Sequence, residues 1–163
     1  MILIGYDGSD DSKAAIEQAA SLFGGQPAVV VTVWEPYTAL LARTPIAMSM
    51  AYESTAEIDA AAQRTAEQTA EQGAGLARAA GLEASARVRA REGSVAQAVL
   101  AEADQANASA VVLGSRGLGG IGSLLLGSVS HAVLQHADRA VVVVPSPKVA
   151  HSRSERRRRD PMA

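Results

Sequence analysis

The chain contains no cysteine, so disulfide bonds, catalytic thiols and zinc sites built on cysteine are all excluded. Aromatic residues make up only 3% of the 163 residues, and no apolar run approaches the roughly 20 residues that a membrane-spanning helix requires. The first residues show no basic segment followed by an apolar segment and a cleavage site. We therefore expect a cytoplasmic protein of one domain, with no membrane partner.

The formal net charge of −2 is unevenly distributed along the chain. Residues 146–163 hold six basic and two acidic residues, which gives this tail a formal charge of +4 and leaves −6 for the rest. An acidic body is a poor general surface for nucleic acid. The tail has no apolar stripe, and its Arg156–Arg159 run has no interleaved aromatic anchors. It is therefore predicted to be disordered and solvated rather than bound to nucleic acid or anionic lipid.

Valine-rich segments alternate with helix-like segments along residues 1–145. Most of the predicted strands are nearly continuous apolar runs, as expected for parallel strands covered on both faces, and the third alternates like an edge strand. The predicted strands are 1–7, 28–34, 84–91, 108–114 and 140–145. The predicted helices are 12–23, 54–80, 95–105 and 127–136. This alternation predicts a single α/β domain with a doubly wound, mostly parallel sheet and helices on both faces.

The carboxyl ends of the predicted strands are where such sheets bind ligands, and there Asp7 ends the first strand and Gly114 ends the fourth. Six of the 14 glycines fall in residues 114–127, directly after a buried strand and directly before a helix. A loop in this place can bring backbone N–H groups to a phosphate, and the next helix adds the positive end of its dipole. This placement favours a phosphate-binding loop over a glycine-rich connection shaped by packing alone.

Two other phosphate motifs do not fit this loop. Gly117, Gly119 and Gly122 match the spacing of the dinucleotide-binding fingerprint, but the loop lies late in the chain and no acidic residue ends the strand that follows. The chain also lacks the P-loop sequence with its lysine.

Other segments carry weaker signals. Asp10 and Asp11 could belong to a metal cluster or act as general bases, but acids in a first helical turn usually favour the helix start through its dipole. His131 and His136 are five residues apart on a helix and do not share a face, so we expect no metal site from protein side chains. Residues 35–53 have no clear period and are either a partly ordered loop near the site or disordered.

The segment between the last two predicted strands resembles a known family signature. Gly114-x2-Gly117-x9-Gly127-Ser128 lies between a VVLG strand and a final AVVVVP strand, and resembles the ATP-binding signature of universal stress proteins. The opening segment ILIGYDGSDDSKAA, with an aspartate at the end of the first strand, is similar to the start of that family. The resemblance covers about residues 1–145 and leaves only the tail outside.

This resemblance implies a fold and an assembly. The fold is a flavodoxin-like sheet in the order 3-2-1-4-5, of the adenine nucleotide alpha hydrolase-like type. The assembly is a homodimer that pairs through the last strand, with Val141, Val142, Val143 and Val144.

The resemblance also implies a site for ATP, with Mg²⁺ accompanying it. Asp7 would hold the ribose and adenosine side, and Val33 would contact adenine through its backbone. Three residues, Gly114, Ser115 and Gly117, would border the ribose and phosphates. The start of the last helix would cradle the phosphates through Gly127, Ser128, Val129 and Ser130.

The expected function is that of an ATP-binding regulatory module of the stress response, whose nucleotide state changes its contacts with its dimer mate or another partner. The alternative is a slow ATP-hydrolysing or nucleotidyl-transfer enzyme of the same fold group. For that reaction the predicted phosphate site offers serines, glycines and Arg116 rather than a general base, so no catalytic residue is assigned. A third hypothesis, an interaction protein with an empty site, conflicts with the intact glycine signature.

Overall fold

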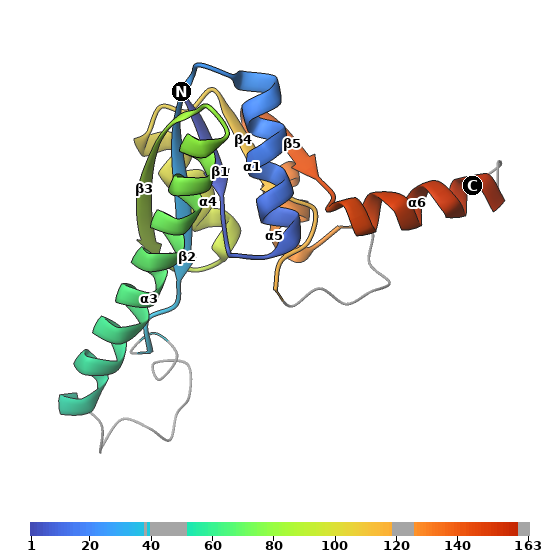
Figure 1. Cartoon of the computed structure of the whole chain (residues 1–163). Coiled ribbons are helices and arrows are strands. Elements are labelled where there is room, and N and C mark those ends of the chain that lie inside the picture. Colours follow the sequence, from blue (N-terminus) through green and yellow to red (C-terminus); the bar gives the residue numbers. More distant parts are fainter. Residues whose placement is uncertain (38, 40–51, 119–125, 160–163) are drawn as a thin grey trace.

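The computed structural model describes residues 1–37, 39, 52–118 and 126–159. Its strands form one parallel sheet in the order β3-β2-β1-β4-β5 (Figure 1). The strands are β1 (Ile2–Gly5), β2 (Pro27–Trp34), β3 (Glu83–Ala90), β4 (Ala110–Gly114) and β5 (Ala140–Val144). The helices are α1 (Asp10–Phe23), α3 (Tyr52–Ala79), α4 (Val95–Gln105), α5 (Ser128–His136) and α6 (Pro147–Arg159). The predicted sheet and its strand order are confirmed.

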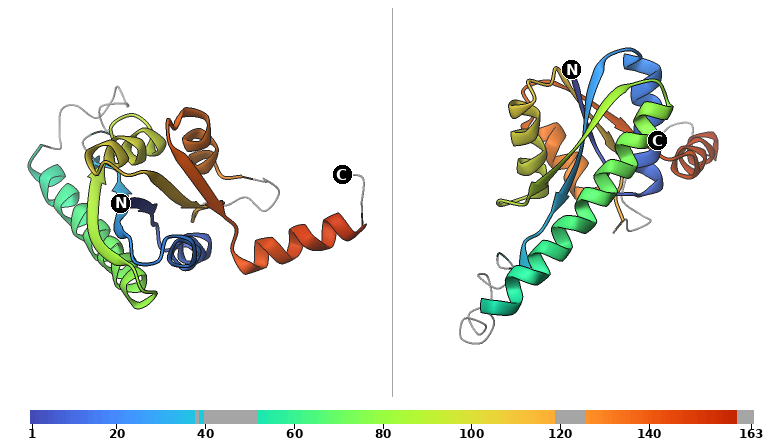
Figure 2. Two further views of the ribbon diagram at one scale, coloured as in Figure 1. Left: turned by 90° about the horizontal axis from the view of Figure 1, so that it is seen from above. Right: turned by 60° about the vertical axis from the view of Figure 1, so that its left-hand side comes forward.

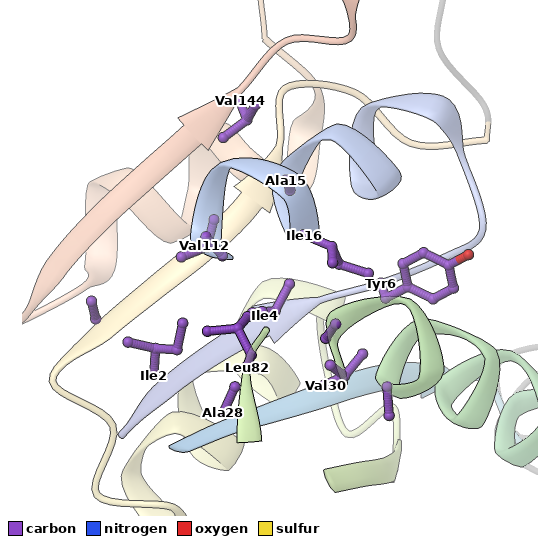
Figure 3. Packing of buried hydrophobic residues seen from close by; sticks show 14 residues of the cluster. Ile2, Ile4, Tyr6, Ala15, Ile16, Ala28, Val30, Leu82, Val112 and Val144 are labelled. Carbon is purple, nitrogen blue, oxygen red and sulfur yellow. The ribbon is translucent and has the colours of Figure 1, made fainter. Parts of the chain in front are cut away.

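Helices cover both faces of the sheet: α1 and α3 lie on one, and α4 and α5 on the other (Figure 2). Successive residues of β1 point to opposite faces, so Ile2 and Ile4 pack toward α1 and α3 while Leu3 packs toward α4 and α5. Figure 3 shows the first of these two layers, with Ile16 of α1 lying over the strands. Because helices cover both faces of the central strands, these strands are continuous apolar runs in the sequence.

The edge strand β3 carries a stripe of arginines, as its alternation predicted, but this stripe is not simply solvated. Arg87 and Arg89 donate to the two carboxylate oxygens of Glu102 on α4, at 2.9 and 3.0 Å. Glu102 is only 3% exposed, so its charge is buried and paired. The two arginines therefore tie the edge of the sheet to α4, and Arg87 does so while remaining exposed.

Serine residues cap the N-termini of two helices that border the carboxyl end of the sheet. Ser94 accepts from the backbone N–H of Gln97 at 3.1 Å and donates its own N–H to the Gln97 side chain at 2.9 Å, the reciprocal pair of a capping box. Ser9 caps α1, accepting from the backbone N–H of Ser12 at 3.2 Å. These caps fix the first turns of α1 and α4 beside the strand ends.

The basic tail differs from its prediction. Residues Pro147–Arg159 form the helix α6, so the expectation of a disordered tail is wrong over this range. Proline suits the first helical position, and the N–H of Ala150 donates to the carbonyl of Ser146 at 2.9 Å. Alanine, lysine, arginine and glutamate all have favourable helix propensities, which the missing apolar stripe obscured.

Two of the sequence predictions fall outside the described residues. They concern most of the 35–53 segment and the loop glycines Gly119, Gly120 and Gly122. Among the described helices, none combines the length and the apolar character that crossing a membrane would require.

Candidate functional site

A cavity of about 580 Å³ opens at the carboxyl end of the sheet, on the side covered by α4 and α5. Its walls come from the ends of β1, β2 and β4, from the first turns of α4 and α5, and from the loop that follows β4. This is the place where a doubly wound sheet binds ligands, because the strand order reverses between β1 and β4. Its volume lies within the ~300–1,000 Å³ typical of small-molecule sites.

One wall of the cavity is apolar. It is built by side chains of β2, α4 and β4, which converge because these three elements pack against one another in the second core layer. The residues are Val31, Val33, Val95, Val99 and Leu113. A surface of this kind suits a flat, weakly polar group such as a heterocyclic base.

Asp7 lies between this wall and the glycine-rich loop. One of its carboxylate oxygens accepts from the backbone N–H and the hydroxyl of Ser9, at 3.0 and 2.6 Å. The other accepts from the backbone N–H of Leu118 at 3.1 Å. A carboxylate has about four lone-pair positions, so Asp7 keeps acceptor capacity for a ligand while it positions the loop.

The first turn of α5 forms the opposite, polar wall. Gly127 is the N-cap residue, and no side chain caps this helix. The backbone N–H groups of Ser128, Val129 and Ser130 are the first of the helix and line the cavity with their residues. An uncapped helix start that faces a cavity attracts an anion through these N–H groups and the helix dipole.

Close packing explains the three described glycines of the loop. A Cβ at Gly114 would lie 2.7 Å from the backbone of Asp11, so this glycine lets β4 approach the start of α1. A Cβ at Gly117 would lie 2.6 Å from a carboxylate oxygen of Asp7, and one at Gly127 would lie 3.3 Å from the carbonyl of Ser115. Neither Gly117 nor Gly127 has a positive φ, so limited space and not backbone conformation disfavours a side chain there.

Ser115 does not line the cavity, although the resemblance placed it beside the ligand. It is fully buried and forms hydrogen bonds with α1, β5 and the start of α5 behind the site. Its hydroxyl donates to the carboxylate of Asp11 at 2.7 Å, and its N–H donates to the carbonyl of Val144 at 2.7 Å. Its own carbonyl accepts from the N–H of Gly127 at 2.7 Å and from the hydroxyl of Ser130 at 3.1 Å.

Asp11 therefore has a role that the sequence did not reveal. It was interpreted as an acid that favours the start of α1, yet its side chain is 6% exposed and is the acceptor for Ser115. The pair connects the start of α1 to the residue that sets the start of α5. The hydrogen bond from a hydroxyl to a buried carboxylate is strong, and breaking it is costly.

Tyr6 contributes to the cavity wall but its side chain packs on the opposite face of the sheet, in the layer of α1 and α3 (Figure 3). Burial raises the pKa of its phenol, and the neighbouring charge of Asp7 raises it further. The neutral phenol is therefore the form present near pH 7.

Eight of the nine predicted site residues line this one cavity, and Ser115 lies behind it. Arg116 and Leu118 also line it, as does Ser12 at the start of α1. The exposed His131 and His136 do not. Within the part of the chain that the structure describes, no group of three or more histidine, aspartate or glutamate side chains could hold a metal ion.

Comparison with known sequences agrees with this architecture. The sequence profile of the universal stress protein family matches residues 1–145, from β1 to just past the end of β5. The chain belongs to the universal stress protein family. Its relatives include a Thermus aquaticus protein, the universal stress protein in the QAH/OAS sulfhydrylase 3′ region. That protein is 32% identical over 147 residues, which cover 88% of this chain and 96% of the relative.

Several solved structures share the fold. The hypothetical protein MJ0577 superposes with a TM-score of 0.71 at 17% identity, covering 88% of this chain and 94% of that one. A universal stress protein in complex with cAMP gives 0.61 at 23% identity, covering 89% and 96%. The protein from Archaeoglobus fulgidus in complex with dAMP gives 0.57 at 19% identity, covering 88% and 95%. At these identities the likeness establishes the flavodoxin-like fold.

Proposed function

We propose that this universal stress protein binds ATP in the cavity at the carboxyl end of the sheet and acts as a regulatory module. The nucleotide state would alter its contacts with a second copy or another partner. The observation that carries the proposal is that one cavity joins an apolar wall, a carboxylate and an uncapped helix start. These three surfaces match the base, the ribose and the phosphates of a nucleotide in that order.

The phosphate end is supported by α5 and the loop before it. The N–H groups of Ser128, Val129 and Ser130 can donate to phosphate oxygens, and Gly127 leaves the approach to them free of a side chain. Arg116 lines the same cavity and brings a positive charge to its wall. Several phosphates can accept from more of these donors than one phosphate can, which favours a nucleoside triphosphate over a monophosphate.

The adenosine end is supported by the apolar wall and Asp7. Val33 is the last cavity-lining residue of β2, so its backbone is available to the edge of a base that lies on the valines. Asp7 can accept hydrogen bonds from ribose hydroxyls with its remaining lone pairs. The cAMP and dAMP complexes of two family members with this fold support an adenine nucleotide as the ligand class.

Magnesium fits the proposal only as a companion of the nucleotide. Asp7 is the one carboxylate among the described residues that line the cavity, and it already accepts three hydrogen bonds. A Mg²⁺ ion keeps several waters and is commonly bound through one or two carboxylates plus phosphates. It would therefore be held mainly by the phosphates. The same scarcity of general bases gives a hydrolytic function little support, since hydrolysis would depend on metal and backbone alone.

Mass spectrometry of small molecules released by denaturing the purified protein tests the proposal. Stoichiometric ATP or ADP is the expected result. If the protein purifies without a ligand, calorimetric titration with Mg-ATP should show saturable binding. Neither a bound nucleotide nor any heat of binding would contradict the proposal and favour a protein with an empty site.

Substitution of Asp7 tests the ribose contact. Asp7→Ala should weaken the binding of adenosine and of ATP by a similar factor, about tenfold or more, because hydrogen bonds to a charged group contribute roughly 1.5–3 kcal/mol. Calorimetry with both ligands measures the two factors. Asp10→Ala is the matched control, since Asp10 is exposed and contacts Lys13 at 3.6 Å. A loss for ATP with no loss for adenosine would contradict the assignment of Asp7 to the ribose.

The edge strand β5 supports a homodimer as part of the proposal. It consists of one alanine and four valines, pairs with β4 on one side, and leaves Val141, Val142 and Val143 partly exposed. An uncharged open edge is an aggregation hazard unless it is covered, and pairing with its symmetry mate would cover it. Sedimentation at micromolar concentration should give twice the 16.7 kDa mass of the chain. A monomeric mass would contradict the dimer.

A further inference from the structure

The basic helix α6 leaves the domain at the open edge of the sheet. Only Pro145 and Ser146 separate it from the end of β5. Figures 1 and 2 show that it points away from the domain, and that it starts on the side of the sheet that α1 covers. Lys148, His151 and Arg158 are exposed along it. A charged helix in this position is well placed to contact a neighbouring molecule rather than its own domain.

The negative charge of the domain is concentrated on the face where α6 starts. The helix α1 holds three acidic residues against one lysine, and α3 holds five acidic residues against two arginines. These two helices therefore carry a formal charge of −5, out of −6 for residues 1–145. The tail carries +4. The strongest charge complement to α6 is thus the face formed by α1 and α3.

Symmetry brings that face within reach of α6. A two-fold axis perpendicular to the sheet would pair β5 with its mate in antiparallel fashion and keep both copies of α1 on the same side. The carboxyl end of β5, where α6 begins, would then lie beside the amino end of the partner's β5. A helix of 13 residues is about 20 Å long, roughly four times the spacing between neighbouring strands. This length is enough to cross the two strands of the partner nearest the shared edge, its β5 and β4.

We propose that α6 is an arm that binds the α1 face of a second copy of this chain. The inference rests on the proposed homodimer and names a contact that completes it. The last turns of α1 lie at the amino end of the sheet, where the arm would arrive. They expose Glu17 and Leu22, the latter 53% exposed, and the last turn of α1 holds no basic residue. Arginines of the arm would complement the negative end of this helix dipole as well as Glu17.

A polyanionic partner fits the arm less well. Nucleic acid or an anionic membrane bound to α6 would approach the acidic α1 and α3 of the same molecule, and like charges there would repel it. The second copy has no such conflict, because its acidic face is the surface that α6 would contact. Binding of α6 to a polyanion is therefore the result of the test below that would overturn the proposal.

The test measures the dimer dissociation constant by sedimentation over a dilution series. It compares the parent chain with a variant in which all four arginines of Arg156–Arg159 are replaced by glutamine. Glutamine keeps a favourable helix propensity and removes four charges. The substitution should raise the dissociation constant at least tenfold at low salt, as expected for several exposed ion pairs lost together. Added salt should weaken the parent dimer strongly and the substituted dimer much less.

The acceptor surface is tested by charge reversal on α1. Glu17→Lys should raise the dissociation constant about fivefold, the scale of one exposed pair turned repulsive. Glu67→Lys makes the same change on the exposed face of α3, farther from the β5 edge, and serves as the control. Thermal unfolding and Mg-ATP titration of each variant, neither of which the arm is expected to govern, check that the domain itself is intact.

The outcomes separate the arm from the dimer and from the nucleotide site. A dimer whose dissociation constant is unchanged by the arginine and Glu17 substitutions overturns the arm and leaves the dimer in place. A parent chain that is monomeric at every concentration overturns both, while Mg-ATP titration still decides the site. Arginine-dependent binding to a DNA duplex or to phosphatidylserine vesicles at 0.15 M salt, with no effect on dimerisation, overturns the arm in favour of a polyanion.

Discussion

Replacing Gly127 with valine is expected to weaken ATP binding more than a hundredfold and to change adenosine binding much less. The new Cβ would lie 3.3 Å from the carbonyl of Ser115 and 3.4 Å from the Cα of Arg116, and the branched side chain must then extend from the start of α5. Loss of two or three charge-assisted hydrogen bonds, at roughly 1.5–3 kcal/mol each, accounts for a factor of this size. Calorimetric titration with adenosine, ADP and ATP measures it.

Gly117→Val should weaken ATP binding to a similar extent, but its pattern across the three ligands should differ. Its Cβ would lie 2.6 Å from an oxygen of Asp7, which we assign to the ribose, so adenosine should lose affinity as well. Gly75→Val is the control, because the contact nearest to a Cβ there is the end of the Arg78 side chain at 4.0 Å. If both loop variants remain folded and bind ATP as tightly as the parent, the loop is shaped by packing and does not bind phosphate.

Breaking the buried pair behind the site should lower the free energy of unfolding substantially. Ser115→Ala removes the hydroxyl that donates to the carboxylate of Asp11 and leaves that carboxylate buried without this donor. We expect a loss of about 2–3 kcal/mol, since an unsatisfied buried charged group costs more than the mean hydrogen bond. Asp11→Ala should cost a comparable amount. Urea unfolding measures both.

A double-mutant cycle distinguishes the pair from two independent contacts. Because each single substitution removes the same hydrogen bond, the double variant should lose about 1 kcal/mol less than the two single losses added together. Asp10→Ala, one residue away and exposed, should change stability by less than about 0.5 kcal/mol. Strictly additive losses at Asp11 and Ser115 would show that the hydrogen bond contributes little.

The structure could be predicted from the sequence wherever a periodicity or a local sequence pattern determines it. Continuous apolar runs marked the parallel strands, and a serine cap marked the start of α4, whose predicted range of 95–105 is the observed one. The polar half of the site was predictable for the same reason. Asp7, Gly114 and Gly127 lie at the strand and helix ends where the chain direction changes, and the topology of the fold brings these ends together.

Contacts between distant segments could not be predicted in this way. The pairing of Asp11 with Ser115 spans 104 residues, and an acid in a first helical turn has the same sequence pattern whether it is exposed or buried. Val33 was the one residue of the apolar wall that was predicted; the others were missed, because residues such as Val95 and Val99 show the helical spacing of any core-facing residues. The tail was mistaken for disorder because it lacks an apolar stripe, although its intrinsic helix propensity is high.

The central claim is that the start of α5 binds the phosphates of an adenine nucleotide, and amide NMR of the ¹⁵N-labelled protein tests it most directly. Titration with adenosine should move the amide signal of Val33 and leave those of Ser128, Val129 and Ser130 nearly unchanged. Titration with Mg-ATP should move all four. If Mg-ATP binds while the amide signals of Gly127, Ser128, Val129 and Ser130 do not move, the phosphates lie elsewhere and the account is contradicted.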